Sequence, residues 1–108
     1  MARGFLGELE QAIMLAVLRL GDNAYGVPIR EELTARIDRK RSFGTIYTTL
    51  ERLADKGFVI ARVGDPTPER GGRAKRFYRL TARGHRTLSR AINARHALER
   101  GLGLDGGR

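Results

Sequence analysis

The chain has 108 residues, which is the usual size of one domain. It contains no cysteine, so disulfide frameworks, thiolate metal sites and cysteine nucleophiles are excluded. Its formal net charge is +9, which favours a polyanionic partner over an acidic small substrate.

The charge and the apolar residues are both unevenly distributed. Residues 42–84 carry nine basic and four acidic side chains, whereas residues 1–41 carry seven basic and six acidic ones. The longest apolar run, Ala12 to Leu18, is shorter than the 18 residues that suggest a membrane span, and no cleavable signal layout surrounds it. We therefore expect a soluble cytoplasmic protein without a membrane partner, associated with the nucleoid.

The first two helices are expected over residues 6–20 and 26–37. In the first, apolar residues recur every three or four positions, and further apolar residues widen the stripe to a second face. A helix that is apolar on two faces needs two partners, so we expect one face to pack on its own domain and the other on a second subunit. In the second helix, Pro28 lies in the first turn, where its missing N–H costs nothing.

A third helix is expected from the N-cap Ser42 to about Gly57. Its apolar stripe should pack inward and consists of Phe43, Ile46, Leu50 and Leu53. The other side carries short hydroxylated and basic side chains, chiefly Thr45, Thr48, Thr49 and Arg52. Short side chains let a helix backbone approach base edges closely, although plain surface threonines are the alternative.

Two short strands follow, over residues 58–63 and 75–80, with Tyr78 and Leu80 facing inward and Phe77 at an edge or interface. Their connection is rich in glycine and in cations that could neutralise phosphates, although a solvated loop is the alternative. Thr81 then caps a final helix that runs to about Arg100. The fold class is therefore mainly α with a small β-hairpin.

Enzyme chemistry has little support in the sequence. His85 and His96 share one expected helix but lie roughly 16 Å apart along its axis, too far to bind one metal. The acidic pairs have no convergent histidine or nucleophile beside them. We expect no catalytic site, no metal and no cofactor.

Three segments together suggest a family. The chain resembles the PadR family of bacterial transcriptional regulators in AYGVPI at residues 24–29, IYTTLERL at residues 46–53 and RFYRLTARG at residues 76–84. The resemblance implies a winged helix-turn-helix repressor that binds a palindromic operator in double-stranded DNA as a homodimer. The DNA-binding residues that it implies are Ser42, Thr45, Tyr47, Thr48, Thr49, Arg52, Arg70, Gly72, Arg73 and Lys75.

The resemblance also implies a dimer built from the first and last helices. Its interface would contain Leu6, Leu9, Ile13, Met14, Val17, Leu88, Ile92 and Leu98. A small hydrophobic effector, if the protein has one, would bind at that interface. Residues 1–80 would be the DNA-binding domain, residues 81–100 the dimerisation helix and residues 101–108 a flexible tail.

Two other functions remain open at this point. A non-specific architectural DNA-binding protein would use the same charges without reading bases. A winged-helix module that binds another protein would leave the concentration of positive charge unexplained. The absence of tryptophan also removes the aromatic platform with which some PadR proteins stack planar drugs.

Overall fold

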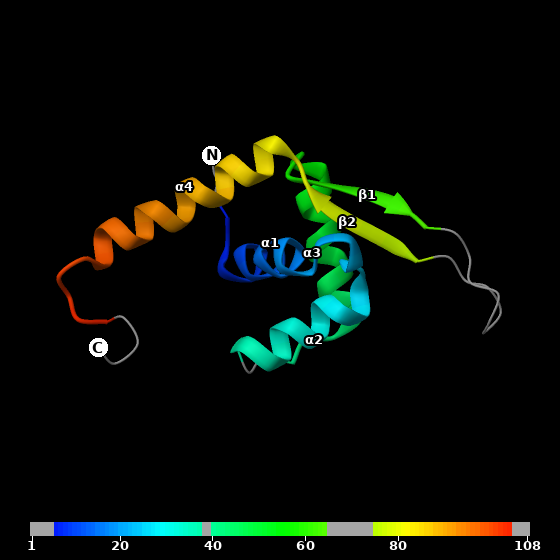
Figure 1. Ribbon diagram of the computed structural model, residues 1–108, viewed down its shortest axis with the longest axis horizontal. Helices are drawn as coiled ribbons and strands as arrows, with labels where there is room; N and C mark the ends of the chain where they lie inside the picture. Colours follow the sequence, from blue (N-terminus) through cyan, green and yellow to red (C-terminus); the bar gives the residue numbers. More distant parts are fainter. Residues whose placement is uncertain (1–5, 38–39, 65–74, 105–108) are drawn as a thin grey trace.

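The structure is a computed structural model that describes residues 6–37, 40–64 and 75–104. Three helices come first: α1 (Glu8–Leu20), α2 (Gly26–Ile37) and α3 (Phe43–Asp55), with a single 3-10 turn, η1 (Gly21–Asn23), between the first two. A hairpin of β1 (Val59–Val63) and β2 (Arg76–Leu80) follows, and α4 (Ala82–Glu99) ends the fold (Figure 1). The expected fold class, mainly helical with one small hairpin, is confirmed.

The helix starts are fixed by local hydrogen bonds. The Ser42 hydroxyl accepts a hydrogen bond from the Thr45 N–H at 3.1 Å, and the Thr81 hydroxyl accepts one from the Gly84 N–H at 2.9 Å. At the start of α1, Glu10 Oε1 accepts from the Gly7 N–H at 2.9 Å. Each bond satisfies an N–H that a helix start would otherwise leave without a partner.

The core lies where α1, α2, α3 and the hairpin meet. Its largest fully buried side chains are Ile13, Met14, Ile29, Ile46, Leu50, Leu53 and Phe58. This corrects part of the expected dimer interface, because five of its residues are at most 3% exposed within the protomer: Leu6, Ile13, Met14, Val17 and Leu88. The outward apolar residues of α1 are instead Leu15 and Leu18, which are 39% and 42% exposed.

The hairpin is antiparallel, with Val59 paired to Leu80 and Val63 to Arg76. Its second strand is joined to the helical body by the Tyr78 N–H, which donates to the Ala24 carbonyl at 2.9 Å. Tyr78 is buried and Leu80 is half-buried, so the predicted inward face of this strand is confirmed. The hairpin therefore extends from a fixed base beside the start of α2.

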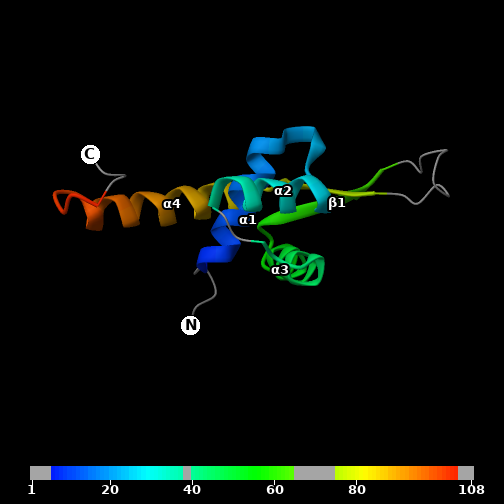
Figure 2. The ribbon, with the colours of Figure 1, turned by 90° about the horizontal axis from the view of Figure 1, so that it is seen from below.

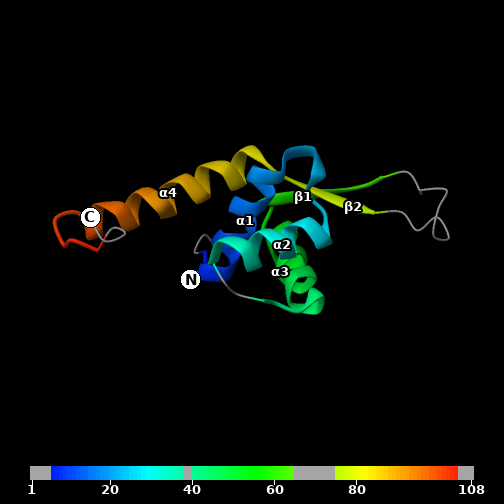
Figure 3. The same cartoon turned by 60° about the horizontal axis from the view of Figure 1, so that its bottom comes forward.

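The start of α4 is held tightly, whereas its end projects beyond the body. The Thr81 hydroxyl donates to the Gly57 carbonyl at 2.7 Å, and a Cβ at Gly84 would overlap the Phe58 carbonyl. Further along, Arg95 Nη1 donates to Gln11 Oε1 at 2.8 Å, but Leu98 is 79% exposed. Figures 1 and 3 show α4 extending away from the helical body, in the direction opposite to the hairpin.

Within the described ranges, the structure contains no helix with the length and apolar character needed to cross a membrane.

Candidate nucleic-acid interface

The third helix has one buried and one exposed face. Ile46, Leu50 and Leu53 are fully buried, while Thr45, Tyr47, Thr48 and Arg52 are exposed. Figure 2 shows α3 on one side of the molecule, with the hairpin extending outward from the region above it. The exposed face thus presents short hydroxylated side chains flanked by a phenol and a guanidinium.

Thr49 is a correction to this set. It is only 2% exposed, and its hydroxyl donates to the Thr45 carbonyl one turn earlier at 2.8 Å. A threonine can be buried in this way because the helix carbonyl satisfies its hydroxyl. The prediction that Thr49 lies on the exposed face is wrong.

The start of α3 is organised by hydroxyl groups. The Ser42 hydroxyl, besides capping the helix, donates to Thr45 Oγ1 at 3.0 Å, and both side chains are exposed. The first helical turn therefore presents two linked hydroxyls and the partly positive end of a helix dipole. Such an arrangement suits contact with a phosphate oxygen.

Arg30 of α2 supports the same end of α3, a role that the sequence did not predict. Its Nε donates to the Arg41 carbonyl at 2.9 Å, and its guanidinium lies 4.5 Å from the centre of the Phe43 ring. Phe43 in turn stacks on Tyr47, with ring centres 6.3 Å apart. Phe43 was expected to pack inward but is 36% exposed, because it packs between these two side chains.

The basic side chains of the hairpin divide between two faces. Arg76 and Tyr78 face the side of α3 and line a cavity with Tyr47, whereas Arg62, Phe77 and Arg79 belong to the other face of the sheet, as strand alternation requires. Lys75, a predicted contact residue, is exposed and lines the cavity on the α3 side. The predicted residues Arg70, Gly72 and Arg73 lie outside the described residues.

An aromatic column joins the base of the hairpin to the body. The Arg62 guanidinium lies 4.9 Å from the centre of the Phe77 ring, and Phe77 packs edge-on against Tyr25 at 5.4 Å. On Tyr25, Lys75 Nζ lies 5.1 Å from the ring centre. Together with the Tyr78–Ala24 hydrogen bond, the column fixes the base of the hairpin beside α2 and thereby relative to α3.

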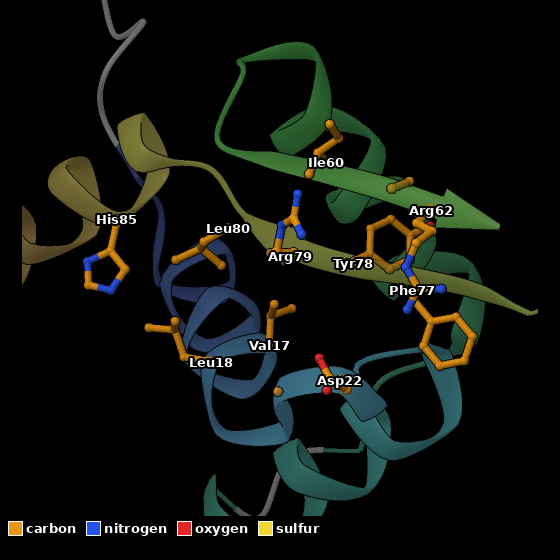
Figure 4. A pocket seen from close by; sticks show the side chains of 12 residues that line it. Val17, Leu18, Asp22, Ile60, Arg62, Phe77, Tyr78, Arg79, Leu80 and His85 are labelled. Carbon is orange, nitrogen blue, oxygen red and sulfur yellow. The ribbon is translucent and has the colours of Figure 1, made fainter. Parts of the chain in front are cut away.

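The other face of the hairpin borders a second hollow, of about 290 Å³, between the end of α1 and the start of α4. Figure 4 shows Leu18, Leu80 and His85 on one side of this hollow and Arg62, Phe77 and Arg79 along the strands. Asp22 lies near its lower edge. This hollow therefore mixes apolar and oppositely charged side chains, unlike the basic face beside α3.

A partly buried ion pair connects α3 to α1. Lys56 Nζ lies 2.9 Å from Glu10 Oε2, and Glu10 is 7% exposed. Burial alone would raise the pKa of Glu10, but the hydrogen bond from Gly7 and the Lys56 ammonium outweigh it and lower the pKa below its ordinary value. The ionised carboxylate thus holds the end of α3 against the start of α1.

The comparison with protein families gives a direct match. The family described as "Transcriptional regulator PadR-like family" matches residues 14–90. The chain therefore belongs to the PadR-like family of transcriptional regulators, which are not enzymes. This confirms the resemblance seen in the sequence.

Solved structures of similar fold agree with this assignment. A PadR family transcriptional regulator from Eggerthella lenta is 26% identical over 89% of this chain and 83% of its own, with a TM-score of 0.65. A PadR family regulator from Clostridium difficile is 20% identical over 90% of this chain and 95% of its own, with a TM-score of 0.71. Bacillus subtilis PadR, solved in complex with operator DNA, is 24% identical over 79% of this chain and 46% of its own, with a TM-score of 0.62. No similar sequence was found among curated proteins.

Proposed function

We propose that the protein is a sequence-specific transcriptional repressor that binds a palindromic operator as a homodimer. One observation carries the proposal: the exposed face of α3 presents Thr45 and Thr48 beside Tyr47 and Arg52, next to the basic base of the hairpin. A helix with this face can enter the major groove while neighbouring cations contact the backbone. The operator complex of the Bacillus subtilis relative is in keeping with this arrangement.

The roles of these side chains follow from their chemistry. Thr45 and Thr48 can donate to or accept from base edges, and their methyl groups can contact a thymine methyl. Tyr47, which is 41% exposed, and Arg52 would bind phosphate oxygens, and Ser42 would do so from the helix start. Lys75 and Arg76 would neutralise the backbone beside the groove, joined by Arg70, Gly72 and Arg73 of the connecting segment.

The homodimer is proposed from the apolar residues that the protomer leaves exposed. Leu98 and Leu102 near the end of α4 are 79% and 64% exposed, and Leu15 and Leu18 add apolar surface on α1. Of the interface residues predicted from the sequence, Leu98 stays in this set, while Leu9 and Ile92 are half-buried. Two-fold symmetry would place two α3 helices about 34 Å apart, in successive major grooves.

This arrangement gives each part of the chain a role. Residues 1–80 would bind DNA, residues 81–100 would form the dimerisation helix, and residues 101–108 would be a tail. An operator that overlaps a promoter would block transcription, which makes the protein a repressor associated with the nucleoid in the cytoplasm.

The proposal can be tested by fluorescence anisotropy with two duplexes: the region upstream of the protein's own gene, and a shuffled duplex of equal length. We expect at least about a thousandfold preference for the upstream duplex, and affinity that falls steeply as salt rises from about 50 to 200 mM. Equal affinity for every sequence would favour an architectural protein. No binding to any duplex at about 0.1 M salt would favour a protein-interaction module.

Two substitutions add detail to this experiment. Arg52→Ala should weaken binding to both duplexes and reduce the salt dependence, because a phosphate contact is sequence-independent. Arg90→Ala removes an equal charge from an exposed position on α4 and is the matched control. If the two variants lose the same affinity, the contact assigned to α3 is wrong.

A further inference from the structure

A cavity of about 420 Å³ lies between the start of α2, the middle of α3 and β2. The chain has three tyrosines, and all of them, Tyr25, Tyr47 and Tyr78, line this cavity. Val27 completes the apolar lining, and the charged lining residues are Glu51, Lys75 and Arg76. Its volume is in the range of sites that hold small ligands.

The aromatic walls are held in place by the fold. Tyr47 lies against the backbone of Gly26, where a Cβ would overlap its hydroxyl, so a glycine is required for this packing. Tyr25 is fixed edge-on against Phe77 at 5.4 Å, and the backbone of Tyr78 is bonded to Ala24. A site whose walls are already ordered loses little conformational entropy when a ligand binds.

The polar groups of the cavity favour a negatively charged ligand. Lys75 and Arg76 supply two positive charges against the single carboxylate of Glu51. Burial raises the pKa of the Tyr78 hydroxyl, and Arg76 offsets only part of that rise, so the hydroxyl stays protonated at neutral pH and can donate a hydrogen bond. Aromatic rings, a hydroxyl donor and two cations thus line one cavity.

We propose that this tyrosine cavity is a binding site for a planar aromatic anion. The ring of the ligand lies among the tyrosine rings, and its anionic group is held by Lys75 and Arg76. Aromatic carboxylates and nucleotides share this chemistry. A ligand in this position contacts α2, α3 and the hairpin at once, but the binding itself does not depend on the DNA-binding function proposed above.

The composition of the chain makes the site easy to observe. In protein labelled with carbon-13 at tyrosine, the ring signals come from three residues, and all three line the cavity. We would titrate the DNA-free protein separately with 2-naphthoate, adenosine monophosphate, inorganic phosphate and the neutral 2-naphthalenemethanol. The two aromatic anions represent the two ligand sources, while phosphate and the neutral alcohol lack the ring and the charge, respectively.

We expect at least one aromatic anion to shift all three tyrosine signals in a saturable manner with a dissociation constant of about 1 mM or lower. The stronger of the two identifies the ligand class. Rings that are unmoved by both anions would overturn the proposal. Binding of phosphate, or of the neutral alcohol, as tight as that of the aromatic anions would also overturn it, because the site would then not require both features.

Substitutions of exposed residues test the assigned contacts without removing core packing. The double variant Lys75→Gln/Arg76→Gln should bind the aromatic anion at least tenfold more weakly and leave binding of the neutral alcohol unchanged. Arg79→Gln is the matched control, since Arg79 lies on the same strand but on the other face. Equal losses in the control and in the double variant would mean that general charge, and not this cavity, attracts the ligand.

Discussion

Helices α1 and α4 both carry apolar residues on more than one face, but they use them differently. In α1, Ile13, Met14 and Val17 are at most 3% exposed within the protomer. In α4, Leu88 is 2% exposed but Leu98, three turns later, is 79% exposed. Apolar periodicity therefore indicates that a face will be covered, but not whether the cover comes from the same chain or from a second copy.

The largest expected effect tests the core role of α1. Met14→Ala should lower the free energy of unfolding by about 2–5 kcal/mol, because the side chain is fully buried and its removal leaves a cavity. Leu15→Ala, next to it on the exposed face, should cost much less. Urea denaturation of both variants measures the difference. Equal losses would mean that the two faces of α1 are covered to the same extent.

The next effect tests how α4 is anchored. Gly84→Ala places a methyl group on the Phe58 carbonyl, and the backbone shift that follows should cost about 1–3 kcal/mol of stability. Ser89→Ala, at an exposed position of the same helix, should change stability by less than about 0.5 kcal/mol. Thermal unfolding distinguishes them, and a Gly84→Ala protein as stable as the wild type would contradict the close contact.

A smaller and pH-dependent effect comes from the ion pair between α1 and α3. Glu10→Gln should cost about 1–2 kcal/mol at neutral pH, because Lys56 then loses its carboxylate partner. The pKa of Glu10 is lower in the folded protein than its model value of 4.5, so the stabilisation is fully present above pH 4.5 and is lost as the pH falls through the folded pKa.

Stability curves of wild type and Glu10→Gln against pH should therefore converge in acid and separate towards neutral pH. Glu8→Gln is the control, because Glu8 is exposed on the same helix turn. A constant difference between wild type and Glu10→Gln at every pH would show that the carboxylate charge does not contribute.

The smallest effect on the protomer is expected at the end of α4. Leu98→Ser should leave the unfolding of the protomer unchanged, since Leu98 is 79% exposed. It should raise the dimer dissociation constant about tenfold, equivalent to about 1.4 kcal/mol. Sedimentation equilibrium tests this directly. An unchanged dissociation constant would remove Leu98 from the interface, and a monomeric wild type would overturn the dimer.

Much of the fold could be predicted from the sequence, because its signals are local. The helix caps Ser42 and Thr81, the alternation around Tyr78 and the apolar spacing of α3 each depend on neighbours within a few residues. These signals set the elements and the polar face of α3. They also gave the family resemblance, since its three segments lie in the same elements.

The errors and omissions have a different origin. Thr49 is buried because a helix carbonyl satisfies its hydroxyl, and the burial of Met14 depends on how α1 packs in three dimensions. Tyr25 and Arg30 contact side chains from other elements, and no pattern in the sequence records those contacts. Composition identified a basic surface, but only the fold separates Arg76 from Arg79 on the two faces of one strand.

The central claim, that the exposed face of α3 reads base sequence, is tested most directly by selection from a random duplex library. The wild-type protein should enrich a two-fold symmetric motif with half-sites about one helical turn apart. Thr48→Val, which keeps the size of the side chain but removes its hydroxyl, should enrich a motif altered at one position in each half-site. Enrichment of the same motif by both proteins, or of no motif by the wild type, would contradict the account.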